Sequence, residues 1–331
     1  MELVAPDGSL YKSQLGGVAR ISLRVPDDVV RSRLLSYYGP AALLLLAAIW
    51  LVLLLVAWSM LYWPMRCSLA DPTLGCKNDY PSYLDVAYYS GVTLFTIGFG
   101  DFVGHSAGVR FISLAEAASG LATLSLFIGF LPALYAGYSR REERLISLDD
   151  GSGTRLAPAH LIAATFQPTG DVEALFAFFA GWQMWMSSVL ETHVAYPMLT
   201  LFRSRRHMQQ HWLNGIAVVS EAAALVCAVV EDGEFRDCHT FLVTTIRALR
   251  EIRHRLGVRE VQPTPLTRRE FGFAYQTLAT LGLPLRSEAS AWREIQRYWP
   301  QHKSEVEALA DYLLLPPGFA SAVTEPIGRF A

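Results

Sequence analysis

The sequence predicts an all-α protein in two parts, a membrane module with two spanning helices and a soluble helical domain. Residues 34–65 contain no charged side chain, and Glu116 is the only charge between Arg110 and Arg140. About 20 apolar residues suffice to cross a bilayer, so both runs are long enough. The second half shows amphipathic helical patterns punctuated by prolines. We expect an N-terminal segment at 1–35, a membrane module at 36–140, a linker at 141–156 and a helical domain at 157–331.

Composition narrows the class of protein further. Hydrophobic residues make up 52% of the 331 residues, and the formal net charge is −2. No stripe of Lys and Arg alternates with aromatic residues, so we expect no nucleic-acid partner. The first 35 residues are polar and lack the pattern of a cleaved secretory signal, which implies that the first span stays in the membrane. The strong preference for Arg over Lys is typical of a GC-rich bacterial genome.

The first span is expected at about Pro40 to Trp63 and the second at about Phe111 to Tyr138. A buried helix of a soluble core is the alternative for the first run, but such helices rarely lack charge over this length. Basic residues precede the first span and follow the second, at Arg140, Arg141 and Arg144. The positive-inside rule therefore places both termini in the cytoplasm and the connecting loop outside the plasma (inner) membrane.

Two cysteines lie in the connecting loop. Cys67 and Cys76 bracket the turn-forming sequence Asp71-Pro72-Thr73-Leu74-Gly75. Because this loop is expected to face an oxidising compartment, a disulfide between them is a plausible prediction. The alternative is a pair of unbonded thiols. Cys227 and Cys238 fall on the cytoplasmic side, where reduced cysteines are expected.

The segment from Tyr83 to Phe95 is apolar and aromatic but too short to cross the membrane, so we interpret it as re-entrant. The hexapeptide Thr96-Ile97-Gly98-Phe99-Gly100-Asp101 follows it. Non-helical backbone is tolerated at membrane depth only where it is buried in protein or lines water. A glycine-rich segment there can line a narrow passage with its carbonyl oxygens, which replace the hydration shell of a cation.

Tyr88 to Phe95 resembles the pore helix of potassium channels, and residues 96–101 resemble their selectivity filter. The resemblance covers about a third of the chain and implies potassium coordination by the carbonyls of Thr96, Ile97, Gly98 and Phe99 and by the Thr96 hydroxyl. Gly98 and Gly100 supply backbone angles that side chains would penalise. Asp101 is expected in a ring of carboxylates at the outer mouth. One filter per chain cannot enclose an ion, so a homotetramer follows. No cofactor is expected beyond the permeant potassium ions.

Three residues depart from the commonest pattern of that family. Phe99 replaces the usual Tyr, and the filter thereby loses a hydroxyl that can tie it to the pore helix. Val92 stands where some relatives carry a Glu, and Phe95 replaces a common Thr. None of these changes removes a coordinating carbonyl, so they bear on filter rigidity and inactivation more than on ion choice.

The resemblance also implies a cavity and a gate on the second span. Gly120 lies near the position of a hinge glycine, although close helix packing is an equal alternative for Gly120 and Gly129. Leu121, Leu124 and Ile128 share a helical face and are expected to line the cavity. Pro132 removes a backbone hydrogen bond and should kink the helix near Ile128, with Leu131 or Tyr135 completing a lower gate. Glu116 is expected behind the pore helix, where it makes a structural hydrogen bond.

The C-terminal half shows five helical patterns, at about Val172–Phe202, His207–Val230, Phe235–Leu256, Arg268–Leu281 and Ser304–Leu315. Residues 174–190 and 211–230 are apolar enough to suggest further spans. Crossing there would place Arg203, Arg205 and Arg206 outside, against the positive-inside rule, so a soluble bundle is favoured. The basic run 203–211 could bind anionic lipid headgroups. His207 and His211 have the spacing of a metal pair, but no third ligand is evident.

The sequence therefore predicts a potassium-selective channel subunit whose helical domain gates or assembles the pore. We expect no enzymatic activity, because no nucleophile or cofactor loop accompanies the polar residues of the C-terminal half. An unknown regulatory ligand on that domain is possible. One alternative is a non-conducting membrane sensor or scaffold that keeps a channel-like fold. Another is a subunit of a potassium uptake transporter, although such proteins usually carry four pore repeats in one chain.

Overall fold

The computed structural model describes residues 28–69, 81–146, 148, 157–202, 211–231, 236–313 and 315. The chain divides into two compact units. One is Pro40–Ala136, called here the membrane unit. The other is Gly137–Ala331 together with Met1–Gly39, called here the helical unit. Within the described ranges every regular element is a helix, apart from a single bridge between Val230 and Leu285. The all-α prediction is confirmed.

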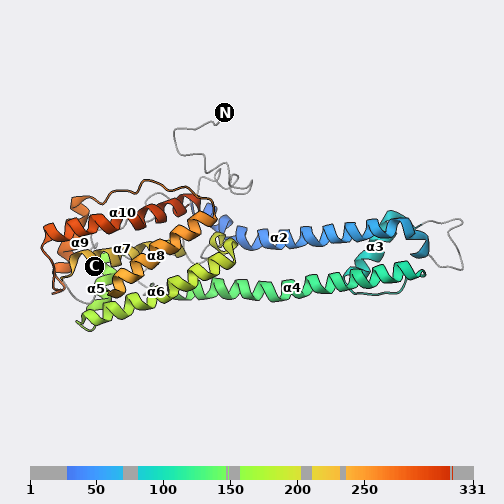
Figure 1. Cartoon of the computed structure of the whole chain (residues 1–331), viewed down its shortest axis with the longest axis horizontal. Helices are drawn as coiled ribbons and strands as arrows, with labels where there is room; N and C mark the ends of the chain where they lie inside the picture. Colours follow the sequence, from blue (N-terminus) through green and yellow to red (C-terminus); the bar gives the residue numbers. More distant parts are fainter. Residues whose placement is uncertain are drawn as a thin grey trace, which may run out of the picture. The chain divides into compact units, whose positions relative to one another are not determined.

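The membrane unit is formed by two long helices and a short one. Its elements are α2 (Asp28–Tyr62), the 3-10 helix η2 (Trp63–Leu69), α3 (Tyr83–Leu94) and α4 (Ala107–Ile146), of which α2 and α4 each extend into the helical unit. Figure 1 shows α3 lying between α2 and α4, at the end of the two long helices where η2 follows α2. Both long helices are apolar and long enough to span a bilayer. Large apolar side chains such as Leu45, Trp50 and Phe111 are more than half exposed in the single chain. They form a surface for lipid or for other protein chains.

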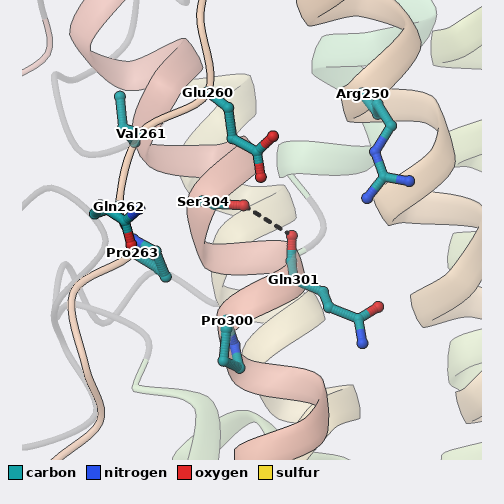
Figure 2. A pocket seen from close by; sticks show the side chains of 8 residues that line it. All are labelled: Arg250, Glu260, Val261, Gln262, Pro263, Pro300, Gln301 and Ser304. Atoms are coloured by element: carbon teal, nitrogen blue, oxygen red, sulfur yellow. Dashed lines mark hydrogen bonds between the residues drawn. The ribbon is translucent and has the colours of Figure 1, made fainter.

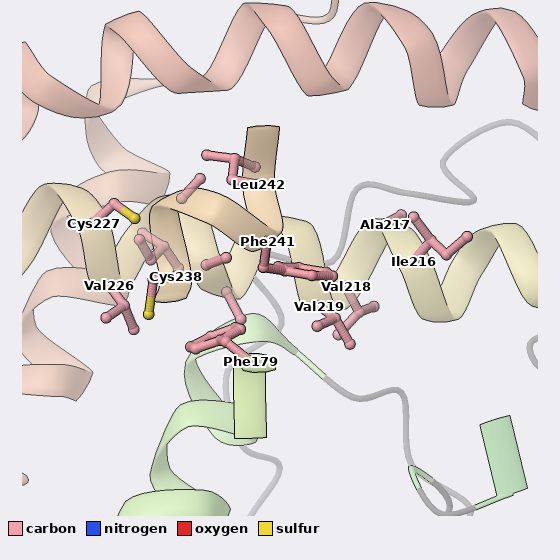
Figure 3. Packing of buried hydrophobic residues seen from close by; sticks show 14 of the residues in the cluster. Phe179, Ile216, Ala217, Val218, Val219, Val226, Cys227, Cys238, Phe241 and Leu242 are labelled. Atoms are coloured by element: carbon pink, nitrogen blue, oxygen red, sulfur yellow. The ribbon is translucent and has the colours of Figure 1, made fainter. Parts of the chain in front are cut away.

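The helical unit is a bundle whose centre is α7. Its remaining elements are α5 (Pro158–Phe166), α6 (Val172–Ala195), η3 (Pro197–Leu201), α7 (Trp212–Val229), α8 (Arg236–Arg255), α9 (Arg268–Ala279) and α10 (Glu288–Tyr312). Helices α5, α8 and α10 pack on α7, and α6 packs on α8. Figure 3 shows part of this core, in which Phe179 of α6 and Phe241 of α8 meet the aliphatic side chains of α7.

The burial of α7 bears on whether residues 211–230 form a third span. The helix is apolar enough to cross a membrane, yet 89% of its residues are buried inside the protein. A spanning helix would present its apolar side chains to lipid, whereas here the other helices of the bundle cover them. The prediction of a helical bundle is therefore supported, with α7 as its core helix, and the solubility of the bundle stays a prediction.

Several boundaries differ from the predicted ones. The first long helix begins at Asp28 and includes Pro40, and α4 continues to Ile146, so the expected linker 141–156 begins as helix. The expected helix 172–202 is broken at Tyr196, where Pro197 starts η3. Helix α10 begins at Glu288 rather than at Ser304, and it remains helical through Pro300. The short helix α5 was not predicted.

Candidate ion-conduction site

The short helix α3 is fixed at both ends by its own sequence. At its start, Ser82 Oγ accepts a hydrogen bond from the Asp85 backbone N–H, and Asp85 Oδ2 accepts one from the Ser82 N–H at 2.8 Å. This reciprocal capping box satisfies two N–H groups that a helix start leaves free. At its end, the Phe95 N–H donates to the Gly91 carbonyl at 3.0 Å. The predicted re-entrant segment, Tyr83 to Phe95, is confirmed as a helix over Tyr83–Leu94.

The backbone after α3 folds back onto the last turn of that helix. The Thr96 N–H donates to the Thr93 carbonyl at 3.0 Å, and the Ile97 N–H donates to the Val92 carbonyl at 2.9 Å. Positive φ angles then occur at Thr96 (54°), Gly98 (64°) and Gly100 (81°). This alternation of sign, which no regular strand has, allows successive carbonyl oxygens to face the same side of the chain.

Thr96 is the most strained of these positions. It is β-branched, and such residues rarely adopt positive φ. A residue held in this region stores on the order of 1–3 kcal/mol, and such strain concentrates at functional sites. The strain at Thr96 is offset locally by the two hydrogen bonds that tie residues 96 and 97 to α3.

The carbonyl groups of residues 96–100 face no donor within the described ranges. The segment is also exposed in the single chain, with 52% of Ile97 and 68% of Phe99 accessible. Backbone carbonyls at membrane depth need partners. Cations and further copies of the chain can provide the partners that one chain lacks.

Asp101 ends the segment. Its Oδ1 accepts a hydrogen bond from the Phe102 N–H at 3.1 Å, and its carboxylate lies near the Tyr88 hydroxyl of α3. The side chain is exposed. Asp101 therefore lies close to Tyr88 of α3, a residue that the sequence did not single out for this role. The placement of Asp101 at an outer mouth stays a prediction.

The residues expected to line a cavity lie together on α4. Leu121, Leu124 and Ile128 are 59%, 56% and 65% exposed, so this face is free in the single chain. Pro132 lies inside α4, which is continuous from Ala107 to Ile146. The expected kink and lower gate stay predictions.

Gly120 has a different role from its neighbours. A Cβ atom at this position would overlap the Leu94 carbonyl oxygen at the end of α3. No atom outside the helix comes within 4 Å of the corresponding point at Gly129. Of the two interpretations, close packing is the one that this geometry supports for Gly120.

Glu116 makes the structural hydrogen bonds predicted for it. The side chain is fully buried behind α3. Its Oε2 accepts a hydrogen bond from the Tyr62 hydroxyl at 2.6 Å, and its Oε1 accepts one from the Ser90 hydroxyl at 2.5 Å. Tyr62 and Ser90 were not predicted. The signal that could have found Ser90 is a small polar residue within the apolar re-entrant helix.

In the loop between the spans, Cys67 is disulfide-bonded, whereas Cys227 and Cys238 are free thiols. The expected partner Cys76 lies outside the described residues, so the pairing stays a prediction. His207 and the basic residues 203–206 also lie outside them. His211 is described, and its Nδ1 caps the start of α7 by accepting from the Leu213 N–H. Among the described residues no His, Cys, Asp and Glu cluster could hold a metal ion.

A second polar site, within the helical unit, holds the last turns of α4. Arg141 is 2% exposed, and its guanidinium donates to the Leu199 carbonyl at 2.9 Å and to the Phe202 carbonyl at 2.6 Å. It also stacks on Trp212, 5.6 Å from the ring centre. A buried Arg is costly unless its donors are satisfied, and here carbonyls at the end of η3 and Glu142 satisfy them.

His193 completes this site. Its Nδ1 lies 2.8 Å from the Val189 carbonyl, which can only accept, so Nδ1 carries the proton. Nε2 is then an acceptor for Arg141 Nη1 at 3.4 Å. Burial, with the Arg141 charge as a second cause, lowers the pKa of His193 to about 3. The ring is therefore neutral at physiological pH and does not repel Arg141.

Further contacts seat the end of α4 against α6 and α7. Arg144 lies over the ring of Trp182 at 5.2 Å, and Gly181 leaves space for its guanidinium. Gly215 leaves space for Leu145 in the same way. Phe202 packs against Gly39 of α2 and lies 6.0 Å from the ring of Tyr138 of α4. Within the helical unit, Phe202 and the helices α6 and α7 thus contact Gly39 of α2 and the last turns of α4.

A cleft of about 520 Å³ lies elsewhere in the helical unit, between α8, α10 and the segment that follows α8. Figure 2 shows Arg250 facing Glu260 and Gln301 across it. Arg250 is already paired with Glu305 at 2.9 Å, and Ser304 donates to the Gln301 carbonyl. Because these groups have partners within the protein, the cleft identifies no ligand, and a regulatory ligand stays a prediction.

Comparison with known proteins supports the channel interpretation of the membrane unit. Residues 46–135 match the family described as "Ion channel". The chain is also 24% identical, over 197 residues, to the uncharacterized membrane protein YdjJ of Bacillus subtilis (strain 168). That alignment covers 59% of this chain and 54% of YdjJ, so the chain spans about half the length of this curated relative. No solved structure matches the chain significantly.

The matched residues include about half of α2, all of α3, the segment 96–101 and most of α4. The matched stretch thus contains parts of two long apolar helices, the short helix between them and the backbone segment 96–101. Residues 46–135 are therefore similar to an ion channel module, and their arrangement is consistent with a pore loop between two spans.

Proposed function

We propose that this chain is a subunit of a potassium-selective channel, with four copies arranged around one conduction path in the plasma membrane. The observation that carries the proposal is the backbone of residues 96–100. Its N–H groups at 96 and 97 bond to α3, its φ angles alternate in sign, and its carbonyl oxygens have no donor in the described part of the chain. Carbonyl oxygens in this arrangement can replace the hydration shell of a potassium ion.

The residues proposed to coordinate the ion are Thr96, Ile97, Gly98 and Phe99, with Asp101 concentrating cations at the mouth. Leu121, Leu124 and Ile128 would line the water-filled cavity, since they form the free face of α4 next to the end of α3. Both termini are proposed to lie in the cytoplasm. We propose no catalytic role for either unit.

Ion flux tests this proposal directly. The full chain, purified and reconstituted in liposomes, should carry potassium in preference to sodium, and barium should block the flux. Equal potassium and sodium flux would contradict the selectivity. Absence of flux, together with absence of potassium binding, would favour a non-conducting sensor or scaffold.

We further propose that the helical unit acts on the pore through the end of α4. The contacts of Arg141, Arg144 and Leu145 support this proposal, because they attach the end of the cavity-lining helix to α6, α7 and η3. The contact of Phe202 with Gly39 adds the beginning of α2. A rearrangement of the helical unit would then pull on both long helices where they leave the membrane.

The neighbouring residues Arg140 and Arg141 give a matched test of this coupling. Arg140 is exposed, whereas Arg141 is buried against carbonyl groups and Trp212. Arg141→Gln should change the open fraction of the channel, and Arg140→Gln should leave it unchanged, as measured by single-channel recording. Equal effects of the two substitutions would contradict coupling through Arg141.

A further inference from the structure

The membrane unit holds one carboxylate in a fully buried position. Glu116 of α4, Tyr62 of α2 and Ser90 of α3 are each 0% exposed. The two hydroxyl groups donate to the two different oxygens of Glu116, at 2.6 and 2.5 Å. One side chain thus connects all three helices, and we call Tyr62, Ser90 and Glu116 the brace.

Other residues on the same face of α4 extend this connection. Ser113, one turn before Glu116, lies 2.6 Å from the Tyr89 hydroxyl of α3. Ser119, nearly one turn after it, accepts a hydrogen bond from the Trp58 indole of α2 at 3.2 Å. Gly120 lies directly against Leu94 at the end of α3. One polar and small-residue face of α4 therefore holds α3 along its last two turns.

The brace is joined to residues 96–97 by a short route. Ser90 is followed at once by Gly91, Val92 and Thr93, whose carbonyl groups accept the N–H groups of Phe95, Ile97 and Thr96. A shift of α3 at Ser90 would move these acceptors, and with them the strained backbone at Thr96. The filter position is thus set by how α3 is held.

This sequence lacks two side chains that can hold such a filter, a Glu at position 92 and a Tyr at position 99. Val92 is apolar, and Phe99 has no hydroxyl group. Among the described residues, Tyr88 of α3 lies near Asp101, beyond the filter. From the side of α4, Glu116 is the ionisable group that reaches α3.

We propose that Glu116 is the positioning residue of the filter, and that its hydrogen bonds from Ser90 and Tyr62 set the selectivity of this pore. This inference rests on the proposed potassium channel function. It assigns to α4 the positioning of the filter, a role that the side chains of Val92 and Phe99 cannot fill. Loss of one donor leaves a buried carboxylate oxygen without its partner and allows α3 to shift.

The test compares three serine substitutions in the full chain. Ser90→Ala removes a donor to Glu116, and Ser90→Thr keeps the hydroxyl group. Ser59→Ala is the matched control, because Ser59 is equally buried and its hydroxyl donates only to the Leu55 carbonyl of its own helix at 2.6 Å. The potassium-to-sodium permeability ratio is measured in liposomes, and assembly is checked by the thermal stability of the purified oligomer.

Ser90→Ala should lower the permeability ratio by about tenfold, the factor expected for the loss of one charge-assisted hydrogen bond. Ser90→Thr and Ser59→Ala should keep the ratio of the unmodified chain. Tyr62→Phe removes the donor to the other carboxylate oxygen from a different helix, so it should lower the ratio even if Ser90→Ala fails to assemble.

An unchanged ratio in Ser90→Ala and Tyr62→Phe would overturn the brace while leaving the channel function intact. An equally large fall of the permeability ratio in Ser59→Ala would also overturn it, because the loss of any buried hydroxyl group would then lower the ratio. Absence of selective flux in the unmodified chain would instead contradict the proposed function, and with it the proposed role of Glu116, which rests on that function.

Discussion

Gly120 shows at the scale of one residue why α4 can pass so close to α3. A methyl group there would overlap the Leu94 carbonyl oxygen, so Gly120→Ala must push α3 away from α4. Such overpacking lowers the free energy of unfolding by about 1–3 kcal/mol. We expect Gly120→Ala to lower the stability of the oligomer and to abolish selective potassium flux.

Gly129 provides the control for this prediction. Because nothing outside the helix lies within 4 Å of its missing Cβ, Gly129→Ala should assemble normally. It should even gain about 0.5–1 kcal/mol of helix stability. Thermal unfolding and liposome flux of the two variants would distinguish close packing from a hinge, since a hinge at Gly120 would alter gating while leaving the stability unchanged.

Two buried histidines predict how the helical unit responds to acid. Burial lowers the pKa of His193 to about 3 and that of His302 to about 4. In the unfolded chain these rings titrate near the ordinary value of about 6.5. Below that pH the unfolded state binds more protons than the folded state does. Stability is therefore fully present above about pH 6.5 and is lost as pH falls, by up to about 1.4 kcal/mol per pH unit for each ring.

Thermal unfolding of the full chain in detergent, followed by tryptophan fluorescence between pH 7.5 and 4.5, measures this effect. Replacing both rings, as His193→Gln with His302→Gln, should flatten the dependence. His254→Gln should leave the dependence unchanged, because His254 lies on the exposed side of α8. A slope that survives the double replacement would show that other groups cause the loss of stability.

At the scale of the element, α7 shows how an apolar helix becomes a core helix. Its one charged residue, Glu221, is paired with Lys303 of α10 at 2.7 Å, and both side chains are 2% exposed. The Lys303 ammonium also lies over the ring of Trp299 at 5.0 Å. A buried pair adds little net stability, but the loss of one partner leaves an uncompensated charge.

Glu221→Leu alone should therefore destabilise the helical unit by about 3–5 kcal/mol. The double replacement Glu221→Leu with Lys303→Met should recover most of that loss, because no charge then remains buried. Chemical denaturation of the single and double variants measures the difference. A double variant no more stable than the single one would indicate that the ion pair itself contributes strongly.

Most elements could be predicted from the sequence, because their signals are local. The apolar runs, the re-entrant segment and the amphipathic patterns each correspond to a helix. The predicted start of α10, at Ser304, was wrong, because the helix begins at Glu288 and continues through Pro300. The short helix α5 was missed because nine residues give too brief a periodic pattern.

The site could be predicted in part. Residues 96–101 are contiguous, so their sequence alone points to a filter. The partners of Glu116 come from two other helices, and no spacing rule connects Tyr62, Ser90 and Glu116. Arg141 looks like an exposed residue of a charged helix end. Its burial depends on η3 and α7, which lie more than 50 residues away along the chain.

At the scale of the whole molecule, one chain is not sufficient for the proposed function. The carbonyl groups of residues 96–100 and the face formed by Leu121, Leu124 and Ile128 are both exposed in it. Cyclic symmetry about one axis would bring four such segments together and cover both surfaces. Each channel would then require four intact filters.

This requirement predicts the behaviour of mixed assemblies. Gly98 adopts a φ of 64°, which strains any other residue, so Gly98→Val should give a chain that inserts and assembles but does not conduct. Equal amounts of this chain and the unmodified chain should then leave about one sixteenth of the flux, because only tetramers of four unmodified subunits conduct. The flux is measured in liposomes after co-expression of the two chains at equal levels and purification through one affinity tag that both chains carry, so that every assembly is retained. A remainder near one quarter would indicate a dimer, and a remainder near one half would show that each chain conducts alone.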